Sequence, residues 1–163
     1  GRPELVFIQS FEVSNLKQLR GRTTLPLVQL LNAGGRPYDF VVKGDARTYA
    51  DLATAAGLAE IATYADGIGV NKNLIFPLAA DGSVGSSPTA LIGDAHAVGL
   101  VVHGWTFRAE NAFLPKNFDV GVDPAAYGDL EGEIALFLKA GMDGFFSDNP
   151  DIGVAARDAF VAD

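Results

Sequence analysis

The sequence contains no cysteine, which excludes disulfide bonds and every metal site built on thiolates. A chain without cysteine fits the cytoplasm and an oxidising compartment equally, so this absence does not decide the location. Long apolar runs are also missing, because no stretch approaches the ~18 residues that a membrane helix needs. No signal peptide is visible, although a targeting signal that preceded Gly1 would lie outside this sequence.

Positive charge is scarce. The chain carries 12 lysines and arginines against 20 aspartates and glutamates, which gives a formal net charge of −8, and no basic cluster stands out. The phosphate backbone of a nucleic acid would be repelled, which argues against a nucleic-acid partner. An anionic membrane surface is disfavoured for the same reason.

The composition is that of a globular domain. Hydrophobic residues make up 48% and charged residues 20% of the chain, which separates it from disordered sequences. Its 163 residues suffice for one domain with a core of its own. A closed (β/α)8 barrel typically needs more, about 250 residues.

Apolar, β-prone runs alternate along the chain with segments of helical periodicity. The runs predict strands over residues 5–11, 25–31, 66–70, 100–107 and 144–147. The periodic segments predict helices over 14–20, 51–64, 89–98 and 129–140, and a last helix that Pro150 opens. Gly57 is a possible breaking point of the second helix. Strands that alternate with helices predict a parallel sheet covered by helices, and this pattern fits an open sheet and a barrel alike.

Local signals indicate where two of these helices begin. Ser14 or Asn15 is expected to cap the first helix. For the third helix, we expect Ser87 at the N-cap, Pro88 at the first helical position and Gly99 after the end.

Two long loops are expected, over residues 32–47 and 108–124. Loops of this length inside compact domains are usually functional or insertions. Residues 74–78 either extend the third strand or form a segment of their own.

Several apolar strands carry one polar residue near the carboxyl end. These residues are Gln9, Gln29, His103 and Asp148. Taken singly, a strand glutamine is more often a satisfied core or edge residue, His103 is as readily structural as catalytic, and Trp105 fits core packing. Taken together, we expect the four on one face at the carboxyl ends of parallel strands, where α/β enzymes build their sites. The pattern predicts a small-molecule site there.

Four segments resemble motifs of one known family. Residues 8–12 read I-Q-S-F-E, 65–72 read A-D-G-I-G-V-N-K, 102–108 read V-H-G-W-T-F-R and 141–150 read G-M-D-G-F-F-S-D-N-P. In this order they are similar to the Q-S-F-D, A-D-G-I-G-P, V-H-P-W-T-x-R and G-V-D-G-I-x-T-D-x-P segments of the glycerophosphodiester phosphodiesterases, with Glu12 where the family usually has aspartate. The four segments together cover nearly the whole chain, and the likeness is to the periplasmic type.

The resemblance implies an α/β fold, the (β/α)8 TIM barrel, of which residues 1–163 would supply about the last four or five βα units of a single domain. It implies metal-dependent hydrolysis of glycerophosphodiesters to glycerol 3-phosphate and an alcohol. In the family, carboxylates on the first strands bind one divalent metal, usually Ca²⁺ or Mg²⁺, and two histidines serve as general acid and base. Neither His96 nor His103 stands in the His-Arg-Gly context of those strands. We therefore expect no catalytic residue and no metal ligand in this chain.

The resemblance implies that this half of the barrel supplies residues that line the substrate pocket. Phe11 and Trp105 match positions that line the glycerol side of the family's pocket, and the Arg108 guanidinium could hold a phosphate or glycerol oxygen. Gln9 and Asn71 are further substrate-binding candidates. Three more residues are expected to be structural near the site: Gln29, His103 and Asp148, the last by hydrogen bonding the strand ends.

Two hypotheses follow for how such a chain works. An open half-barrel leaves two sheet edges unpaired and a core side exposed, so the first hypothesis pairs it with the N-terminal half of the same barrel, as a separate or cleaved chain, into an active enzyme. The second is a catalytically silent half-barrel that associates with itself as a binding or scaffold module. An enzyme of another class lacks support, because no G-x-G-x-x-G, P-loop or G-x-S-x-G motif is present. The likeness to the periplasmic type also implies a periplasmic or secreted location.

Overall fold

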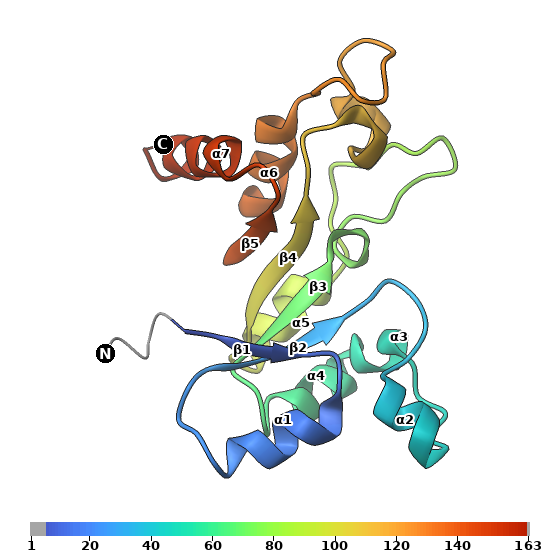
Figure 1. The fold of residues 1–163 in the computed structure, drawn as a ribbon, viewed down its shortest axis with the longest axis vertical. Coiled ribbons are helices and arrows are strands. Elements are labelled where there is room, and N and C mark those ends of the chain that lie inside the picture. The colour runs from blue at the N-terminus through green and yellow to red at the C-terminus, as the bar shows by residue number, and fades with distance from the viewer. Residues whose placement is uncertain (1–5, 163) are drawn as a thin grey trace.

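The computed structural model describes residues 6–162 and contains one sheet of five parallel strands. The strands are β1 (Ile8–Ser10), β2 (Leu27–Leu31), β3 (Gly67–Asn71), β4 (Val101–Phe107) and β5 (Gly144–Ser147). They lie side by side in chain order, and the sheet curls into a half-barrel (Figure 1). All five predicted strands are therefore confirmed, although Leu5 of the first prediction lies outside the described residues. Within those residues, β1 and β5 each pair with one strand only.

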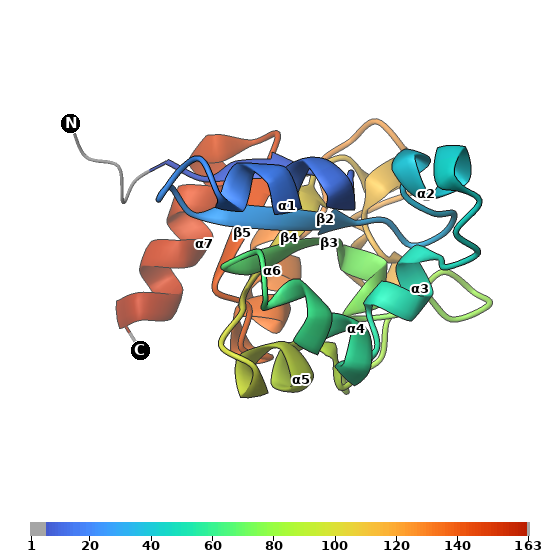
Figure 2. The same ribbon diagram turned by 90° about the horizontal axis from the view of Figure 1, so that it is seen from below.

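Helices cover the outward face of this sheet. Within residues 6–162 they are α1 (Val13–Arg20), α2 (Tyr38–Lys43), α3 (Tyr49–Leu52), α4 (Ala55–Ile61), α5 (Leu91–Ala97), α6 (Leu130–Lys139) and α7 (Pro150–Ala162), with 3₁₀ turns η2 (Lys72–Leu74), η3 (Asn111–Phe113) and η4 (Lys116–Phe118). Figure 2 shows α4 and α5 on the same side of the sheet, and α6 packs against α7. Residues 74–78 do not extend β3 but form a segment of their own, which runs from the end of η2 to an isolated antiparallel bridge between Leu78 and Val84.

The hydrophobic core lies between the sheet and these helices. Phe107 at the end of β4 meets Phe137 of α6 edge-to-face with ring centroids 5.1 Å apart, and Phe137 meets Phe76 at 4.7 Å. All three side chains are fully buried. Edge-to-face pairs of this kind add roughly 0.5–1.5 kcal/mol each beyond the burial of their area, so this cluster fixes the carboxyl end of β4 against α6.

The loop predicted over residues 32–47 is not a simple loop, because it contains α2. Glu12 caps this helix from a distance: its carboxylate accepts hydrogen bonds from the backbone N–H groups of Tyr38 at 3.2 Å and Asp39 at 2.6 Å. The first N–H groups of a helix need acceptors and favour a negative charge. The capping residue lies more than twenty positions upstream, so no local pattern indicates it.

The predicted N-cap of the first helix is wrong. Helix α1 begins at Val13, with Glu12 at the N-cap in place of Ser14 or Asn15. The reason is tertiary, because the Ser14 backbone N–H donates to Asp39 Oδ2 at 2.7 Å. The carboxylate of Asp39 on α2 thus accepts a hydrogen bond from the first turn of α1, which the side chain of an N-cap serine or asparagine would otherwise accept.

The predicted start of the third helix is also wrong. Helix α5 begins at Leu91, not at Pro88 after a Ser87 cap. Thr89 does not join the helix, because its backbone N–H donates a hydrogen bond to the Ile75 carbonyl oxygen at 2.8 Å. A long-range bond therefore replaces the first turn that the local sequence favours.

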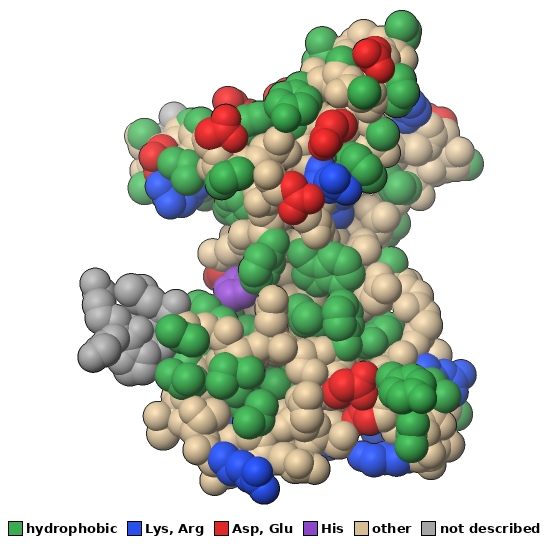
Figure 3. Space-filling model, in the orientation of Figure 1, with side chains coloured by type: hydrophobic (Ala, Val, Ile, Leu, Met, Phe, Trp, Pro, Cys, Tyr) green, Lys and Arg blue, Asp and Glu red, His purple; other side chains and the backbone are tan. Residues whose placement is uncertain are grey.

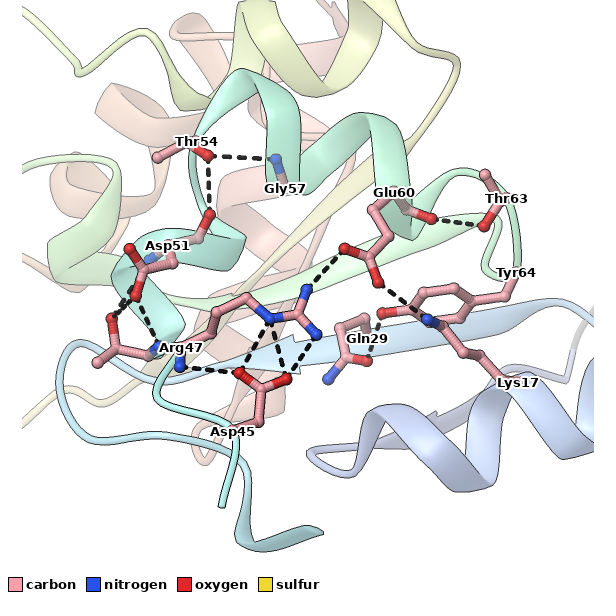
Figure 4. Close-up of polar contacts among 11 residues, drawn as sticks. Lys17, Gln29, Asp45, Arg47, Asp51, Thr54, Gly57, Glu60, Thr63 and Tyr64 are labelled. Atoms are coloured by element: carbon pink, nitrogen blue, oxygen red, sulfur yellow. Dashed lines mark hydrogen bonds and ion pairs between the residues drawn. The ribbon is translucent and has the colours of Figure 1, made fainter. Parts of the chain in front are cut away.

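The helix predicted over residues 51–64 is broken, but before Gly57 and not at it. Thr54 separates α3 from α4 and caps α4 by accepting a hydrogen bond from the Gly57 N–H at 3.2 Å (Figure 4). A Cβ atom on Gly57 would stand 2.5 Å from the Leu52 carbonyl oxygen and also against that of Asp51. Real Cβ atoms do not approach carbonyl groups so closely. Glycine is therefore required where the chain turns from α3 into α4.

Replacing Gly57 with alanine should lower the free energy of unfolding by about 1–3 kcal/mol, because the added methyl group overpacks a backbone contact that cannot give way. Gly93 in α5 provides the matched control, since a Cβ there meets nothing within 4 Å. Gly93→Ala should raise the free energy of unfolding by roughly 0.5–1 kcal/mol through helix propensity. Urea unfolding of both variants measures the two effects. Equal midpoints for the two variants would contradict the steric explanation.

Candidate functional site

A hollow lies on the inner face of the half-barrel, at the carboxyl ends of β1, β4 and β5. Its volume is about 370 Å³, and it is lined by Gln9, Phe11, Leu30, Trp105, Thr106, Phe146 and Asp148. Figure 3 shows hydrophobic side chains gathered over the strands in the middle of this face, where the molecule narrows. The structure thus brings together three of the predicted substrate residues, Gln9, Phe11 and Trp105, with Asp148 beside them.

Two aromatic rings form one wall of this hollow. Phe11 and Trp105 meet edge-to-face with ring centroids 5.9 Å apart and planes at 89°. The Trp105 indole N–H donates to the Gly69 carbonyl oxygen of β3 at 2.9 Å, and the Trp105–Thr106 peptide bond is cis. On its other side Phe11 meets Tyr49 of α3 at 6.0 Å. Since both rings are held by fixed neighbours, the wall presents a preformed apolar surface.

Arg108 lies directly after β4 and does not itself line the hollow, but it contacts Asp148, which does. Its Nε lies 3.0 Å from Asp148 Oδ2, and its guanidinium carbon lies 3.8 Å from the centre of the Phe113 ring. Among the described residues Nε makes no hydrogen bond of good geometry, so the attraction to Asp148 is Coulombic. The Arg108 side chain is 35% exposed. A guanidinium held on two sides and open on a third is suited to bind an anionic oxygen.

Comparison with known proteins decides the family. The family model described as the glycerophosphoryl diester phosphodiesterase family matches residues 1–152. The chain belongs to this family. It is 34% identical over 143 residues to a glycerophosphodiester phosphodiesterase of Arabidopsis thaliana, a match that covers 88% of this chain and 35% of that protein. The chain therefore spans about a third of the length of this curated relative.

A solved structure supports the fold. A protein from Agrobacterium tumefaciens, described as a glycerophosphoryl diester phosphodiesterase, superposes with a TM-score of 0.52 at 20% identity. The superposition covers 95% of this chain and 44% of that one. A five-stranded half-barrel of parallel strands is thus consistent with the barrel-like fold of the glycerophosphoryl diester phosphodiesterase family.

The expectation that all four polar strand residues share one face is wrong for Gln29. In the β1–β2 register Gln9 pairs with Val28, and since side chains alternate along a strand, Gln29 points to the opposite, helix-covered face. There it is fully buried. Its amide donates to the Phe11 carbonyl oxygen at 3.0 Å, and its Oε1 accepts from the Tyr64 hydroxyl at 3.0 Å (Figure 4). Burial raises the pKa of Tyr64, so this hydroxyl stays protonated and remains a donor.

Two further predicted site residues, Asn71 and His103, lie beside the hollow and do not line it. The Asn71 amide donates to Asn32 Oδ1 at 3.4 Å, and its Oδ1 accepts from the Asn73 N–H at 3.0 Å. His103 lies on the inner face, with its ring 5.0 Å from that of Phe7. Burial lowers the pKa of His103, while the nearby Asp143 opposes the shift, so the neutral imidazole is favoured.

Asn149 is a residue of the site that the sequence reasoning missed. Its Oδ1 accepts from the Ala109 N–H at 2.9 Å, and its amide donates to the Tyr127 hydroxyl at 3.2 Å. These bonds join the segments that follow β4 and β5, and so they fix Arg108 beside Asp148. Asp148 joins the strand ends through its backbone N–H, which donates to the Phe107 carbonyl oxygen at 3.0 Å, and the side chain of Asn149 adds two further bonds. Asp148 and Asn149 are adjacent in the S-D-N-P segment. The presence of a second polar residue directly after Asp148 was the sequence signal that could have indicated Asn149.

The described residues do not fit a metal centre. Over residues 6–162, no three histidine or acidic side chains are grouped closely enough to bind a metal ion. His96 forms a pair with Asp143, with Nε2 and Oδ2 2.8 Å apart, but these two lie before β4 and β5, at the end of the sheet opposite the hollow. In the same part of the chain, no helix has the length and hydropathy that crossing a membrane requires.

Proposed function

We propose that this chain is the substrate-binding half of a metal-dependent glycerophosphodiester phosphodiesterase, which hydrolyses a glycerophosphodiester to glycerol 3-phosphate and an alcohol. Membership of the family supports the activity. The observation that carries the role of this chain is the hollow at the carboxyl strand ends, with two aromatic rings on one wall and the Arg108 guanidinium in contact with Asp148, which lines it. Carboxyl strand ends are where barrels of this type place their active sites.

In this proposal the chain supplies about the last four or five βα units of the barrel, and its partner is the N-terminal half. The match covers only 44% of the solved relative, which leaves room for that half. A second hollow of about 450 Å³ follows the free edge of β5, lined among others by Leu138, Phe145 and Val154. An apolar groove beside a strand whose outer edge has no partner among the described residues is suited to receive further strands and helices.

The metal and the two histidines belong to that partner in this proposal, since the described residues do not form a metal site. Ca²⁺ or Mg²⁺, when bound there, would neutralise the charge of the phosphodiester. The present chain binds and orients the substrate. Arg108 holds a phosphate or glycerol oxygen, while Phe11 and Trp105 pack against the carbon side of glycerol and exclude water. Gln9 offers its amide group to the remaining hydroxyls, whereas Asn71 can bind substrate only if its amide leaves Asn32.

The alternative of a catalytically silent, self-associating module is not favoured by any observation, whereas the family match favours the enzyme. For the complete protein we further propose a periplasmic or secreted location. The likeness of residues 65–72 to the periplasmic type supports this part of the proposal.

Combining this chain with the N-terminal half of its barrel should produce glycerophosphodiesterase activity that neither half shows alone. The two halves would be produced together, purified as a complex and assayed for release of glycerol 3-phosphate with Ca²⁺, with Mg²⁺ and with a chelator. We expect activity with one of the metals and none with the chelator. A complex that forms but releases no glycerol 3-phosphate with any divalent metal would refute the proposed function.

A further inference from the structure

A buried ion pair lies behind the candidate site. Lys72, the residue after β3, has its Nζ 2.7 Å from Glu133 Oε1 on α6. Glu133 is fully buried, and the Lys72 side chain is 12% exposed. Removing two charges from water offsets most of what their attraction provides, so such a pair is a weak source of stability. Its presence calls for a role other than holding the core together.

The same lysine also holds the segment that follows β4. Lys72 Nζ donates to the Phe113 carbonyl oxygen at 3.0 Å and lies 5.5 Å from the centre of the Phe107 ring. Phe113 ends the 3₁₀ turn η3, and its ring is the surface on which the Arg108 guanidinium stacks at 3.8 Å. Phe113 therefore contacts both residues: its carbonyl oxygen accepts a hydrogen bond from Lys72, and its ring stacks on Arg108.

We propose that Glu133 and Lys72 are positioning residues for Arg108, acting through Phe113. Glu133 fixes the lysine ammonium, the ammonium fixes the Phe113 carbonyl, and the Phe113 ring then fixes the plane of the guanidinium opposite Asp148. An arginine side chain has many rotamers to lose when it binds an anion. An arginine that is already ordered loses less on binding. This inference rests on the proposed role of Arg108 in binding the phosphodiester.

The test replaces the pair as a unit in the complete enzyme. Lys72→Met/Glu133→Leu exchanges two buried charges for apolar groups of similar size, a change that buried pairs commonly tolerate. Lys17→Met is the control, because it breaks an equally direct pair, from Lys17 Nζ to Glu60 Oε1 at 2.9 Å between the exposed faces of α1 and α4, and leaves Glu60 paired with Arg47 at 2.7 Å (Figure 4). We expect KM for the phosphodiester to rise about tenfold in the first variant, with kcat within about twofold and the control unchanged.

A structural effect is separated from a positioning effect by repeating the exchange in an Arg108→Met background. If Lys72 and Glu133 act through Arg108, the double exchange adds nothing to KM there. A rise in KM of similar size in both backgrounds, or no rise in either, overturns the inference. Glu133→Gln, which keeps the size of the side chain, serves in the same cycle if the double exchange prevents folding.

A second measurement does not need activity. The Nε–H group of Arg108 can be followed by ¹⁵N relaxation in the complete protein, where a held guanidinium gives a high order parameter. We expect that order to fall in Lys72→Met/Glu133→Leu and to stay in the control. An unchanged Arg108 order parameter overturns the positioning role. Absence of diesterase activity in the unaltered complete protein would instead refute the proposed function, and the relaxation result would still decide the inference.

Discussion

Replacing Arg108 with methionine should lower kcat/KM for a glycerophosphodiester about 100-fold in the assembled enzyme, since a charge-assisted bond to the substrate is worth roughly 1.5–3 kcal/mol. Methionine keeps an unbranched, flexible chain but lacks the guanidinium that stacks on the Phe113 ring at 3.8 Å, so the substitution removes the charge without adding bulk. The loss is expected mainly in KM if the guanidinium binds substrate and transition state equally. Steady-state kinetics with one defined glycerophosphodiester measures both parameters.

Two further substitutions sharpen this prediction. Arg108→Lys keeps the charge but not the planar group that stacks on Phe113, and it should lower kcat/KM about 10-fold. Arg22→Met is the control, because Arg22 is exposed in the turn between α1 and β2, at the amino ends of the strands and away from the hollow. Its kcat/KM should stay within about twofold. A value for Arg108→Met within twofold of the unaltered enzyme would remove Arg108 from the substrate site.

The parts of this fold that sequence reasoning predicted are those that local pattern determines. The last strand, Gly144–Ser147, has the predicted bounds, because a short apolar run lies between Gly141 at a positive φ of 100° and the helix that Pro150 opens. Helix α6 differs from its prediction by one residue at each end, with Asp129 as the N-cap. Such signals need no knowledge of distant residues.

The parts that were missed depend on contacts between distant residues. The face of Gln29 depends on the register of β1 against β2, and a shift of one residue moves a side chain to the other face. Helix α2 depends on Glu12, and the start of α5 depends on a bond between Thr89 and Ile75. Lys72 and Glu133 stand 61 positions apart, so neither predicts the other. The motifs contain four residues that line the hollow, Gln9, Phe11, Trp105 and Asp148, whereas the contacts that hold these residues in place became visible only in the fold.

Replacing Lys72 alone with methionine should lower the free energy of unfolding by about 3–5 kcal/mol near neutral pH, because it leaves the Glu133 carboxylate buried without its counter-charge. In the unaltered protein, burial already raises the pKa of Glu133 above its ordinary value of 4.5, and Lys72 opposes that shift. Without Lys72 the pKa of the folded state rises further. The contribution of Glu133 to stability is then fully present below the unfolded pKa and is lost as pH rises through the folded pKa.

The gap in stability between Lys72→Met and the unaltered protein should therefore be small near about pH 4 and widen toward about pH 8. At the low-pH end of this range Glu133 is protonated and needs no counter-charge. In the unaltered protein the buried Lys72 then has no charged partner. Adding Glu133→Leu to Lys72→Met should recover most of the lost stability at the alkaline end, because no buried charge remains. Urea unfolding across this range provides the measurement. A gap that is the same at every pH would mean that Lys72 stabilises the fold through the Phe113 carbonyl bond and its apolar chain, and not through the charge of Glu133.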